Sequence, residues 1–334
     1  MPSTIVERLY PNNGQGMKLA TYVTAGPPRL AVVADDELLV DVNRAYAALA
    51  RARGLAAPDA LADAHAPADA LAFLQCGEAA VAAAREALEH ALGLGRETAI
   101  ARQLAVPLAD AKLLPPIVNP PKVVCVARNY AEHAKEAGLQ VSEIPILFAR
   151  FANTLVAHGD PIVRPSVSEQ VDWEGELAVV IGKPGHRIAR ADAMDHVAGY
   201  SVFNDVSVRD YQFRVTQYTG GKNFSHSGPF GPFLVLKDEV ADPHKLDLTT
   251  ELNGEVVQRG NTSDMIFDIP AIVEHISEFV ALEAGDVIPM GTPSGVGFKR
   301  TPPRFLTPGD VVRVTVEGVG VLENPVIDEQ ELSA

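Results

Sequence analysis

Two glutamates separated by one residue, Glu174 and Glu176, precede an apolar run and could bind a cation. The run from Leu177 to Ile181 is rich in β-branched residues and ends at a glycine, which is typical of a buried strand. Alternation along that strand carries it back through both glutamates and places their carboxylates on one face. Two ionised side chains beside a core strand need a cation, a proton or a basic partner, because they repel each other and lose hydration. The alternative is a solvated strand edge, where the pair needs no such partner.

A third carboxylate, Asp205, directly follows the apolar run from Gly199 to Asn204 and is predicted to project from the end of a strand. It could complete a set with Glu174 and Glu176. Three oxygen donors with no cysteine and no neighbouring histidine suit a hard dication, Mg²⁺ or Mn²⁺, with Ca²⁺ as a further candidate and zinc less suited. Taken alone, Asp205 could instead cap the helix that is predicted to begin there.

Three polar residues downstream are candidates for binding a substrate. Arg209 and Gln212 share one face if their segment is helical, and a guanidinium can bind a substrate carboxylate with two hydrogen bonds. The alternative is an ion pair between Arg209 and Asp205. Lys222 follows two glycines but lacks the spacing of a phosphate-binding loop. A lysine near carboxylates and a metal is therefore predicted to stabilise a developing enolate or oxyanion.

A candidate general base lies earlier in the chain, where Asn129 and Glu132 have the spacing of a helix-capping box. His133 and Glu136 then lie three residues apart on one helix face. A carboxylate in that position can hold the imidazole tautomer and raise its basicity, which suits a base that activates water. The same spacing on a surface helix often has no function.

The glycine-rich turn from Gly291 to Gly297 follows an apolar run and contains Thr292. Such a turn can present backbone N–H groups and a hydroxyl to an anion, but a plain tight turn is an equal alternative.

Composition narrows the class of protein. Twenty-eight basic and 43 acidic residues among 334 give a net charge of −15, with no dense basic cluster, which argues against nucleic acid and anionic membrane as partners. Cys76 and Cys125 are the only cysteines, too few for a disulfide framework or a thiolate metal site, so we expect a reducing, cytoplasmic location. Glu7 and Arg8 stand where a signal peptide would be apolar, and no run is long enough to span a membrane.

The sequence divides into two parts that differ in composition and in hydrophobic pattern. Residues 1–16 are predicted to form a loose arm, and 17–115 a small α/β domain with strands at 18–24, 29–35 and 37–41 and a helix at about 77–93. This part has no cluster of titratable residues and is expected to be a scaffold or docking module without a catalytic group. A group of prolines between 107 and 121 predicts the domain boundary near 115.

Residues 116–334 are predicted to form a mainly β domain, so that the fold class is α+β. The expected strands lie at 122–126, 177–181, 198–204, 232–236, 246–252, 311–316 and 319–323. The expected helices lie at 130–137, 190–196, 205–217 and 268–281.

Taken together, these motifs resemble the fumarylacetoacetate hydrolase family over about residues 118–328. The resemblance rests on the order and spacing of Asn129-Tyr130-x-x-His133-x-x-Glu136, Asp172-Trp173-Glu174-Gly175-Glu176, Asn204-Asp205-Val206-Ser207-Val208-Arg209-Asp210, Gly221-Lys222, and Gly285-Asp286-Val287-Ile288-x-x-Gly291-Thr292-Pro293-x-Gly295-Val296-Gly297. The preceding part resembles the variable N-terminal domain of the longer bacterial members. Ala127 and the residues after Lys222 depart from the commoner family pattern, which leaves the substrate open.

The resemblance implies a mixed β-sandwich roll, usually a homodimer, and a role for each motif residue. Mg²⁺ or Mn²⁺ would be bound by Glu174, Glu176 and Asp205. The water-activating pair on a mobile lid would be His133 and Glu136. Substrate would be bound and polarised by Tyr130, Arg209, Gln212, Lys222 and Thr292.

The activity predicted from this resemblance is metal-dependent hydrolysis of a carbon–carbon bond in a 2,4-diketo acid, such as an acylpyruvate. Family members also decarboxylate, hydrate or isomerise related keto acids such as oxaloacetate, through the same metal-stabilised enolate, and these activities are kept as alternatives. A non-catalytic keto-acid-binding protein is the remaining alternative, and the intact His133 and Glu136 argue against it.

Overall fold

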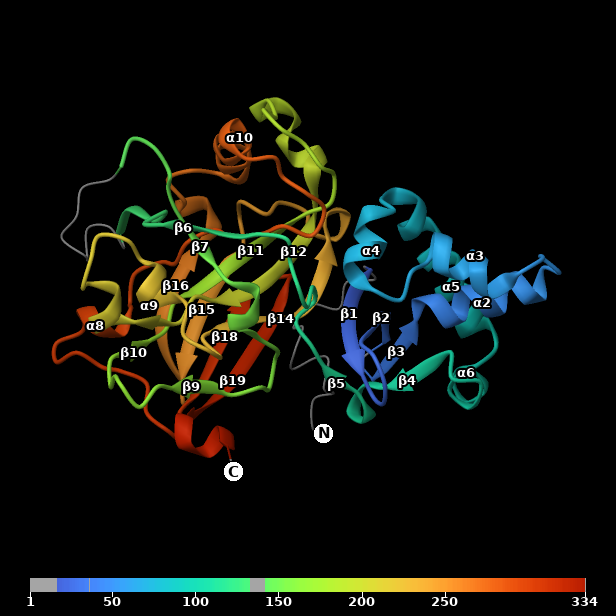
Figure 1. The fold of residues 1–334 in the computed structure, drawn as a ribbon, viewed down its shortest axis with the longest axis horizontal. Helices are drawn as coiled ribbons and strands as arrows, with labels where there is room; N and C mark the ends of the chain where they lie inside the picture. The colour runs from blue at the N-terminus through green and yellow to red at the C-terminus, as the bar shows by residue number, and fades with distance from the viewer. Residues whose placement is uncertain (1–16, 36, 133–141, 334) are drawn as a thin grey trace.

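The computed structural model describes residues 17–35, 37–132 and 142–333. The fold is α+β and rich in strands, with a small helical part at one end of a larger β domain (Figure 1). The predicted fold class is thus confirmed. None of the helices in the described part of the chain has the length and apolar character needed to cross a bilayer.

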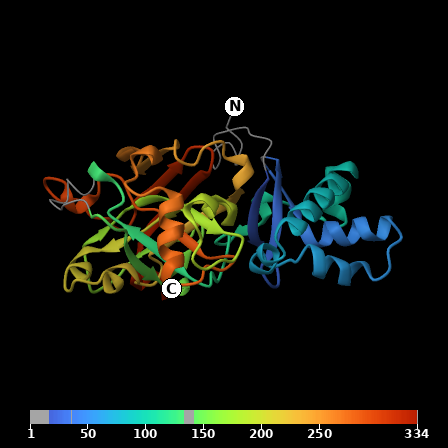
Figure 2. The same ribbon diagram turned by 90° about the horizontal axis from the view of Figure 1, so that it is seen from above.

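The N-terminal part combines five strands with a group of helices. Its elements are β1 (Lys18–Val23), β2 (Arg29–Asp35), β3 (Leu38–Asp41), α2 (Val42–Ala52), α3 (Pro58–His65), α4 (Ala70–Gln75), α5 (Glu78–Gly93), α6 (Arg96–Ala101), β4 (Ala105–Pro107) and β5 (Lys112–Leu113). The helix expected at about 77–93 is α5, whose small buried face consists of alanines. Seen from above, the helices extend outward from the strands of this part (Figure 2), although α4 also meets the β domain, where a Cβ at Gly285 would lie 2.4 Å from Cδ1 of Leu71.

The β domain contains the remaining strands and short helices. Its strands are β6 (Val123–Ala127), β7 (Ile146–Arg150), β8 (Leu155–Val156), β9 (Ile162–Arg164), β10 (Val171–Asp172), β11 (Gly175–Ile181), β12 (Val197–Asn204), β13 (Ser207–Val208), β14 (Gly228–Leu236), β15 (Asp247–Leu252), β16 (Glu255–Asn261), β17 (Val287–Pro289), β18 (Val311–Val316) and β19 (Gly320–Asp328). Its helices are α8 (Arg209–Gln212), α9 (Thr219–Lys222) and α10 (Ile269–Phe279), with a 3₁₀ segment at Arg190–His196.

One sheet runs through both parts of the molecule. Its order is β4-β3-β2-β1-β14-β12-β11-β17-β6-β7, and β1 joins β14 through the antiparallel pairs Lys18↔Val235 and Leu19↔Leu234. Buried side chains of both parts also share one apolar cluster, in which Leu30 and Phe73 belong with Phe230. A second sheet, in the order β16-β15-β18-β19-β9, packs against β11 and β12 to close the β domain. The boundary near residue 115 stays a prediction.

The prediction of a helix at 205–217 is wrong. The chain leaves β12 at Asn204 and forms β13, which pairs with β10 through Val171↔Val208 and Asp172↔Ser207, and the helical turn α8 begins only at Arg209. The backbone N–H of Arg209 donates to the carbonyl of Gln170 at 2.8 Å. Val206 and Val208 are β-branched and alternate along the chain, which suits this pairing with a distant strand better than a helix.

Candidate active site

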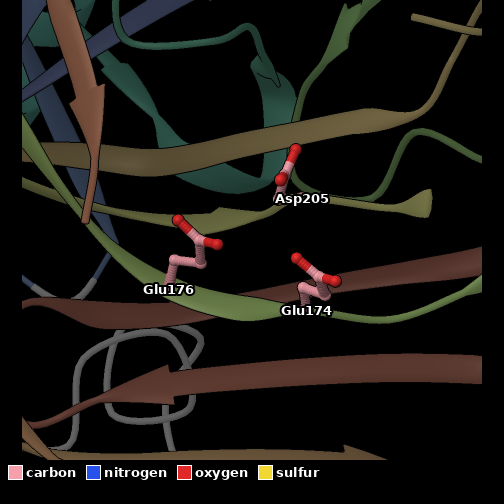
Figure 3. Close-up of side chains that lie close together, drawn as sticks. All are labelled: Glu174, Glu176 and Asp205. Atoms are coloured by element: carbon pink, nitrogen blue, oxygen red, sulfur yellow. The ribbon is translucent and has the colours of Figure 1, made fainter. Parts of the chain in front are cut away.

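The three carboxylates predicted to bind a metal converge in the folded chain. Ligand atoms of Glu174, Glu176 and Asp205 all lie within 4.8 Å of one another, and each residue is buried. Figure 3 shows the two glutamates projecting from one side of the β11 segment towards Asp205. The alternative of a solvated strand edge is excluded, since the three residues are 7%, 2% and 0% exposed respectively.

Strand register brings these residues together. β11 and β12 are antiparallel, with Gly175 opposite Asn204, so Glu174 and Asp205 lie at the same end of the pair. Glu174 precedes the strand rather than lying within it, but its N–H donates to the side chain of Asn204 at 3.0 Å. The N–H of Asp205 donates to the carbonyl of Glu174 at 2.8 Å. Asp205 is therefore fixed by this pairing and does not cap a helix.

Lys222 bridges two members of the cluster. Its Nζ lies 2.7 Å from Oε2 of Glu174 and 2.5 Å from Oδ2 of Asp205. Burial alone would lower the pKa of Lys222, but the charges of Asp205 and Glu174 outweigh that effect and raise it, so the ammonium stays charged at neutral pH. Gly221 makes this position accessible, because a Cβ there would lie 2.4 Å from the Cβ of Gln212 on α8.

The carboxylates that hold Arg209 belong to Asp172 and Glu174, whereas the ion pair predicted as the alternative was with Asp205. Its Nε donates to Asp172 at 2.8 Å, and its Nη1 donates to Glu174 at 2.6 Å and to Oε1 of Gln212 at 2.8 Å. Asp205 is paired instead with Arg150, at the end of β7. The remaining nitrogen of Arg209, Nη2, is buried and has no partner among the described residues. It is a donor available to a ligand in the site.

Two residues that organise the site were not among the predicted site residues. Asp172 is fully buried and also accepts hydrogen bonds from the N–H groups of Gly297 at 2.7 Å and Phe298 at 3.0 Å. The sequence carried a signal for it, because it belongs to the Asp-Trp-Glu-Gly-Glu motif. Arg150 pairs with Asp205 and donates to Ser227 at 2.6 Å. Arg150 lies outside every motif, and no sequence signal pointed to it.

The glycine-rich turn binds a carboxylate that belongs to the protein itself. The N–H of Gly291 donates to Oε2 of Glu176 at 2.9 Å. Gly291 has φ +92°, and a Cβ there would lie 2.8 Å from the Cβ of Asn129. The Thr292 hydroxyl donates to the carbonyl of Gly175 at 2.9 Å. The turn therefore positions the carboxylate cluster.

The charges of the site suit a dication. Burial raises the pKa of Glu176 well above its ordinary value, and the nearby charges of Asp205 and Glu174 raise it further. Among the described residues, the buried carboxylates of the site are those of Asp172, Glu174, Glu176 and Asp205, and the buried cations beside them are Arg150, Arg209 and Lys222. With all of these groups ionised, one negative charge is left over. A carboxylate oxygen has two lone pairs, so the oxygens of Glu176 and Asp205 that each accept one hydrogen bond, from Gly291 and Lys222, can also bind a metal. Oxygen ligands and an uncompensated negative charge fit Mg²⁺ or Mn²⁺.

A pocket opens onto the cluster and is lined by several of the predicted substrate-binding residues. Its lining includes the three carboxylates together with Arg209, Gln212, Lys222 and Thr292, and also Val126, Ala127, Arg128, Phe148, Phe213, Tyr218 and Phe298. Tyr130 is buried but is not among the described residues that line this pocket. The side chain of Asn129 binds the backbone of Phe267 and Met290, and the capping box expected with Glu132 stays a prediction. His133 and Glu136 lie outside the described residues.

Comparison with known proteins identifies similar chains. Residues 122–327 match the family profile described as fumarylacetoacetate (FAA) hydrolase C-terminal. The human mitochondrial oxaloacetate tautomerase FAHD2A is 47% identical over 258 residues, which cover 76% of this chain and 78% of the relative. The oxaloacetate tautomerase YisK of Bacillus subtilis is 38% identical over 314 residues, 93% of this chain and 100% of the relative.

A solved structure extends the similarity to the whole fold. The fumarylacetoacetate hydrolase of Exiguobacterium antarcticum superposes with a TM-score of 0.73 at 32% identity, covering 94% of this chain and 100% of that one. The similarity therefore includes the N-terminal part as well as the β domain.

Proposed function

The chain belongs to the fumarylacetoacetate hydrolase family, and on that basis we propose that it is a divalent-metal-dependent enzyme that interconverts the enol and keto forms of a 2-oxo dicarboxylic acid such as oxaloacetate. The observation that carries this proposal is the buried cluster of Glu174, Glu176 and Asp205 beside the charged Lys222 and the unpartnered Nη2 of Arg209. The oxaloacetate tautomerases among its relatives, one matched over its whole length, support the choice of reaction.

Glu174, Glu176 and Asp205 would hold Mg²⁺ or Mn²⁺. When bound, such an ion supplies a Lewis acid that polarises the oxygens of a 2-oxo acid. The arrangement of three carboxylates around one space leaves the remaining ligand positions to substrate or water.

The side chains beside the cluster bind and stabilise the substrate. Keto–enol interconversion moves one proton at C3 and one at the C2 oxygen, and negative charge develops on that oxygen in between. Lys222, which is held in the charged form, can donate a hydrogen bond to it. Nη2 of Arg209 can donate to the adjacent carboxylate, because its other nitrogens already hold the guanidinium in place.

The reaction can be followed by mixing the enol form of oxaloacetate with the protein and recording the loss of enol absorbance. We expect Mn²⁺ to accelerate the loss and EDTA to return it to the uncatalysed rate. Lys222→Met should lower kcat while the protein still binds Mn²⁺. If the wild-type protein with Mn²⁺ left the enol decay unchanged, the proposal would be wrong.

Hydrolysis of an acylpyruvate is the second candidate, favoured by the hydrolase whose structure matches nearly the whole chain and by the spacing of His133 and Glu136. Hydrolysis needs a base that makes hydroxide from water, which typically contributes about 10²–10⁴-fold in rate. His133→Ala should nearly abolish acylpyruvate cleavage and leave Mn²⁺ affinity unchanged. Glu136→Gln should give a milder loss. Full hydrolytic activity in His133→Ala would refute this role.

The homodimer implied by the family resemblance is part of the same proposal. Sedimentation analysis of the purified protein tests it directly.

A further inference from the structure

Arg128 lies at the end of β6 in a conformation that few residues adopt. Its φ is +58°, in the left-handed region, which is unfavourable for a residue with a Cβ. Asn129 imposes this conformation, since it is fully buried and its amide donates to the carbonyl of Met290 at 2.8 Å and of Phe267 at 3.0 Å. The fold thus maintains a strained backbone at a residue whose side chain lines the pocket.

A tyrosine holds the guanidinium of Arg128 in place. Nη2 of Arg128 donates to the hydroxyl of Tyr218 at 2.7 Å. Tyr218 is itself fixed, because its ring meets that of Phe148 edge-on at 5.6 Å. The carbonyl of Tyr218 also accepts the N–H of Lys222 at 3.1 Å. Arg128 is therefore oriented by the same turn that presents Lys222 to the cluster.

In the described part of the chain, the charge of Arg128 is not matched by an acid. Three cations line the pocket, and two of them, Arg209 and Lys222, are paired with carboxylates. Within residues 17–35, 37–132 and 142–333, no carboxylate lies within ion-pair distance of Arg128, whose side-chain partner is the neutral Tyr218. A guanidinium oriented in this way is suited to a carboxylate ligand, which it can bind through two hydrogen bonds.

We propose that Arg128, oriented by Tyr218, binds the substrate carboxylate distal to the metal cluster and so makes the site selective for 2-oxo dicarboxylic acids over monocarboxylic ones. Arg209 and the metal ligands would bind the proximal carboxylate and the C2 oxygen, so each end of the substrate would meet its own arginine. This inference rests on the proposed function and adds the specificity-determining residue.

Arg128→Gln tests the inference with two substrates that differ only in the distal group, oxaloacetate and its 4-methyl ester. Loss of a hydrogen-bonded charge pair lowers kcat/KM for oxaloacetate by about 10- to 100-fold. The value for the ester is expected to stay within about twofold of wild type, because the ester has no distal charge. Arg128→Lys retains the charge and should recover part of the loss.

Arg214→Gln is the matched control. Arg214 is exposed, stacks on Tyr211 and does not line the pocket, so its removal changes net charge by the same amount. Both substrates should react as with wild type. Tyr218→Phe, which removes only the hydroxyl that orients the guanidinium, should weaken the preference for the diacid less than Arg128→Gln does. Equal losses on both substrates in Arg128→Gln would show a purely structural role and overturn the inference.

A binding measurement separates this inference from the proposed reaction. Malate and lactate share a 2-hydroxy acid group, and only malate has a distal carboxylate. Calorimetry with the Mn²⁺-loaded protein should show tighter binding of malate, with the advantage lost in Arg128→Gln. If the wild type failed to tautomerise oxaloacetate but kept this advantage, the proposed function would fail and the inference would stand. If malate bound no more tightly than lactate, the inference would fail.

Discussion

Replacing Asp172 by asparagine should destabilise the fold through Arg209. Oδ1 of Asp172 accepts N–H bonds from Gly297 at 2.7 Å and from Trp173 at 2.8 Å. Oδ2 accepts from Nε of Arg209 at 2.8 Å and from the N–H of Phe298 at 3.0 Å. An asparagine has one carbonyl oxygen, so in either orientation its NH₂ group faces two donors.

The size of the loss follows from these contacts. Two buried donors left without acceptors cost about 1–3 kcal/mol each. The substitution also leaves the buried Arg209 with Glu174 as its remaining carboxylate, and breaking one side of a buried ion pair costs about 3–5 kcal/mol. These terms describe overlapping contacts and are not added, so we expect Asp172→Asn to lower the free energy of unfolding by about 3–5 kcal/mol.

The single tryptophan gives a local probe for this experiment. Trp173 follows Asp172 in the chain and is fully buried, so its fluorescence reports unfolding of the β domain. Urea unfolding at pH 7 and fixed protein concentration should show a lower midpoint with an unchanged slope. Asp192→Asn makes the same chemical change at an exposed position and should stay within about 0.5 kcal/mol of wild type. A loss below about 1 kcal/mol for Asp172→Asn would refute the argument that this residue compensates Arg209.

Three further outcomes are expected. Glu176→Gln should weaken Mn²⁺ binding by roughly 100-fold or more in calorimetry, because the charge of one proposed ligand is lost. The metal-free variant should unfold at no lower urea concentration than the metal-free wild type, because burial raises the pKa of Glu176 and disfavours its charged form. Undiminished Mn²⁺ affinity would exclude Glu176 as a ligand. Burial lowers the pKa of His158 to about 4, so the unfolded chain takes up the proton first as the pH falls, and stability should decrease from pH 6.5 to 4 by roughly 2–3 kcal/mol. His158→Asn, which can still accept the N–H of Glu323, should remove that component from pH-dependent urea unfolding, and an unchanged pH profile would contradict it. Because β1 pairs with β14, far-UV circular dichroism and Trp173 fluorescence should report one urea transition, whereas an earlier dichroism transition would mean that the N-terminal part unfolds alone.

The parts of the site that sequence analysis predicted are those in which chemistry and local pattern coincide. Glu174 and Glu176 are separated by one residue and lie beside a β-branched run, and Asp205 directly follows a second apolar run. Paired strands have regular geometry, so the three side chains converge once β11 pairs with β12. The same regularity explains why the long helix at Glu78–Gly93 was predicted and why each predicted strand overlaps a strand of the structure, whereas other strands, among them β7 and β16, were missed.

Pairings between distant segments were beyond the reach of local pattern. The stretch from Asp205 to Arg209 was predicted to begin a helix, yet it pairs with β10 as β13. The two parts of the chain were expected to be separate domains, and nothing in the sequence indicated that β1 continues the sheet of β14. Register between distant strands depends on the final packing of both faces and cannot be read from either strand alone.

The basic residues that neutralise the carboxylates of the site were harder to predict from the sequence than the carboxylates themselves. The three carboxylates that could bind a metal come from two adjacent strand ends, so short sequence motifs contain them. The cations that stabilise those carboxylates need only reach the same space. Arg150 does so from β7, a strand on the edge of the sheet and 55 positions before Asp205 in the chain. Removal of Arg150 would leave a fully buried carboxylate without its guanidinium partner, so a residue outside every motif has as large an expected effect on the site as a metal ligand.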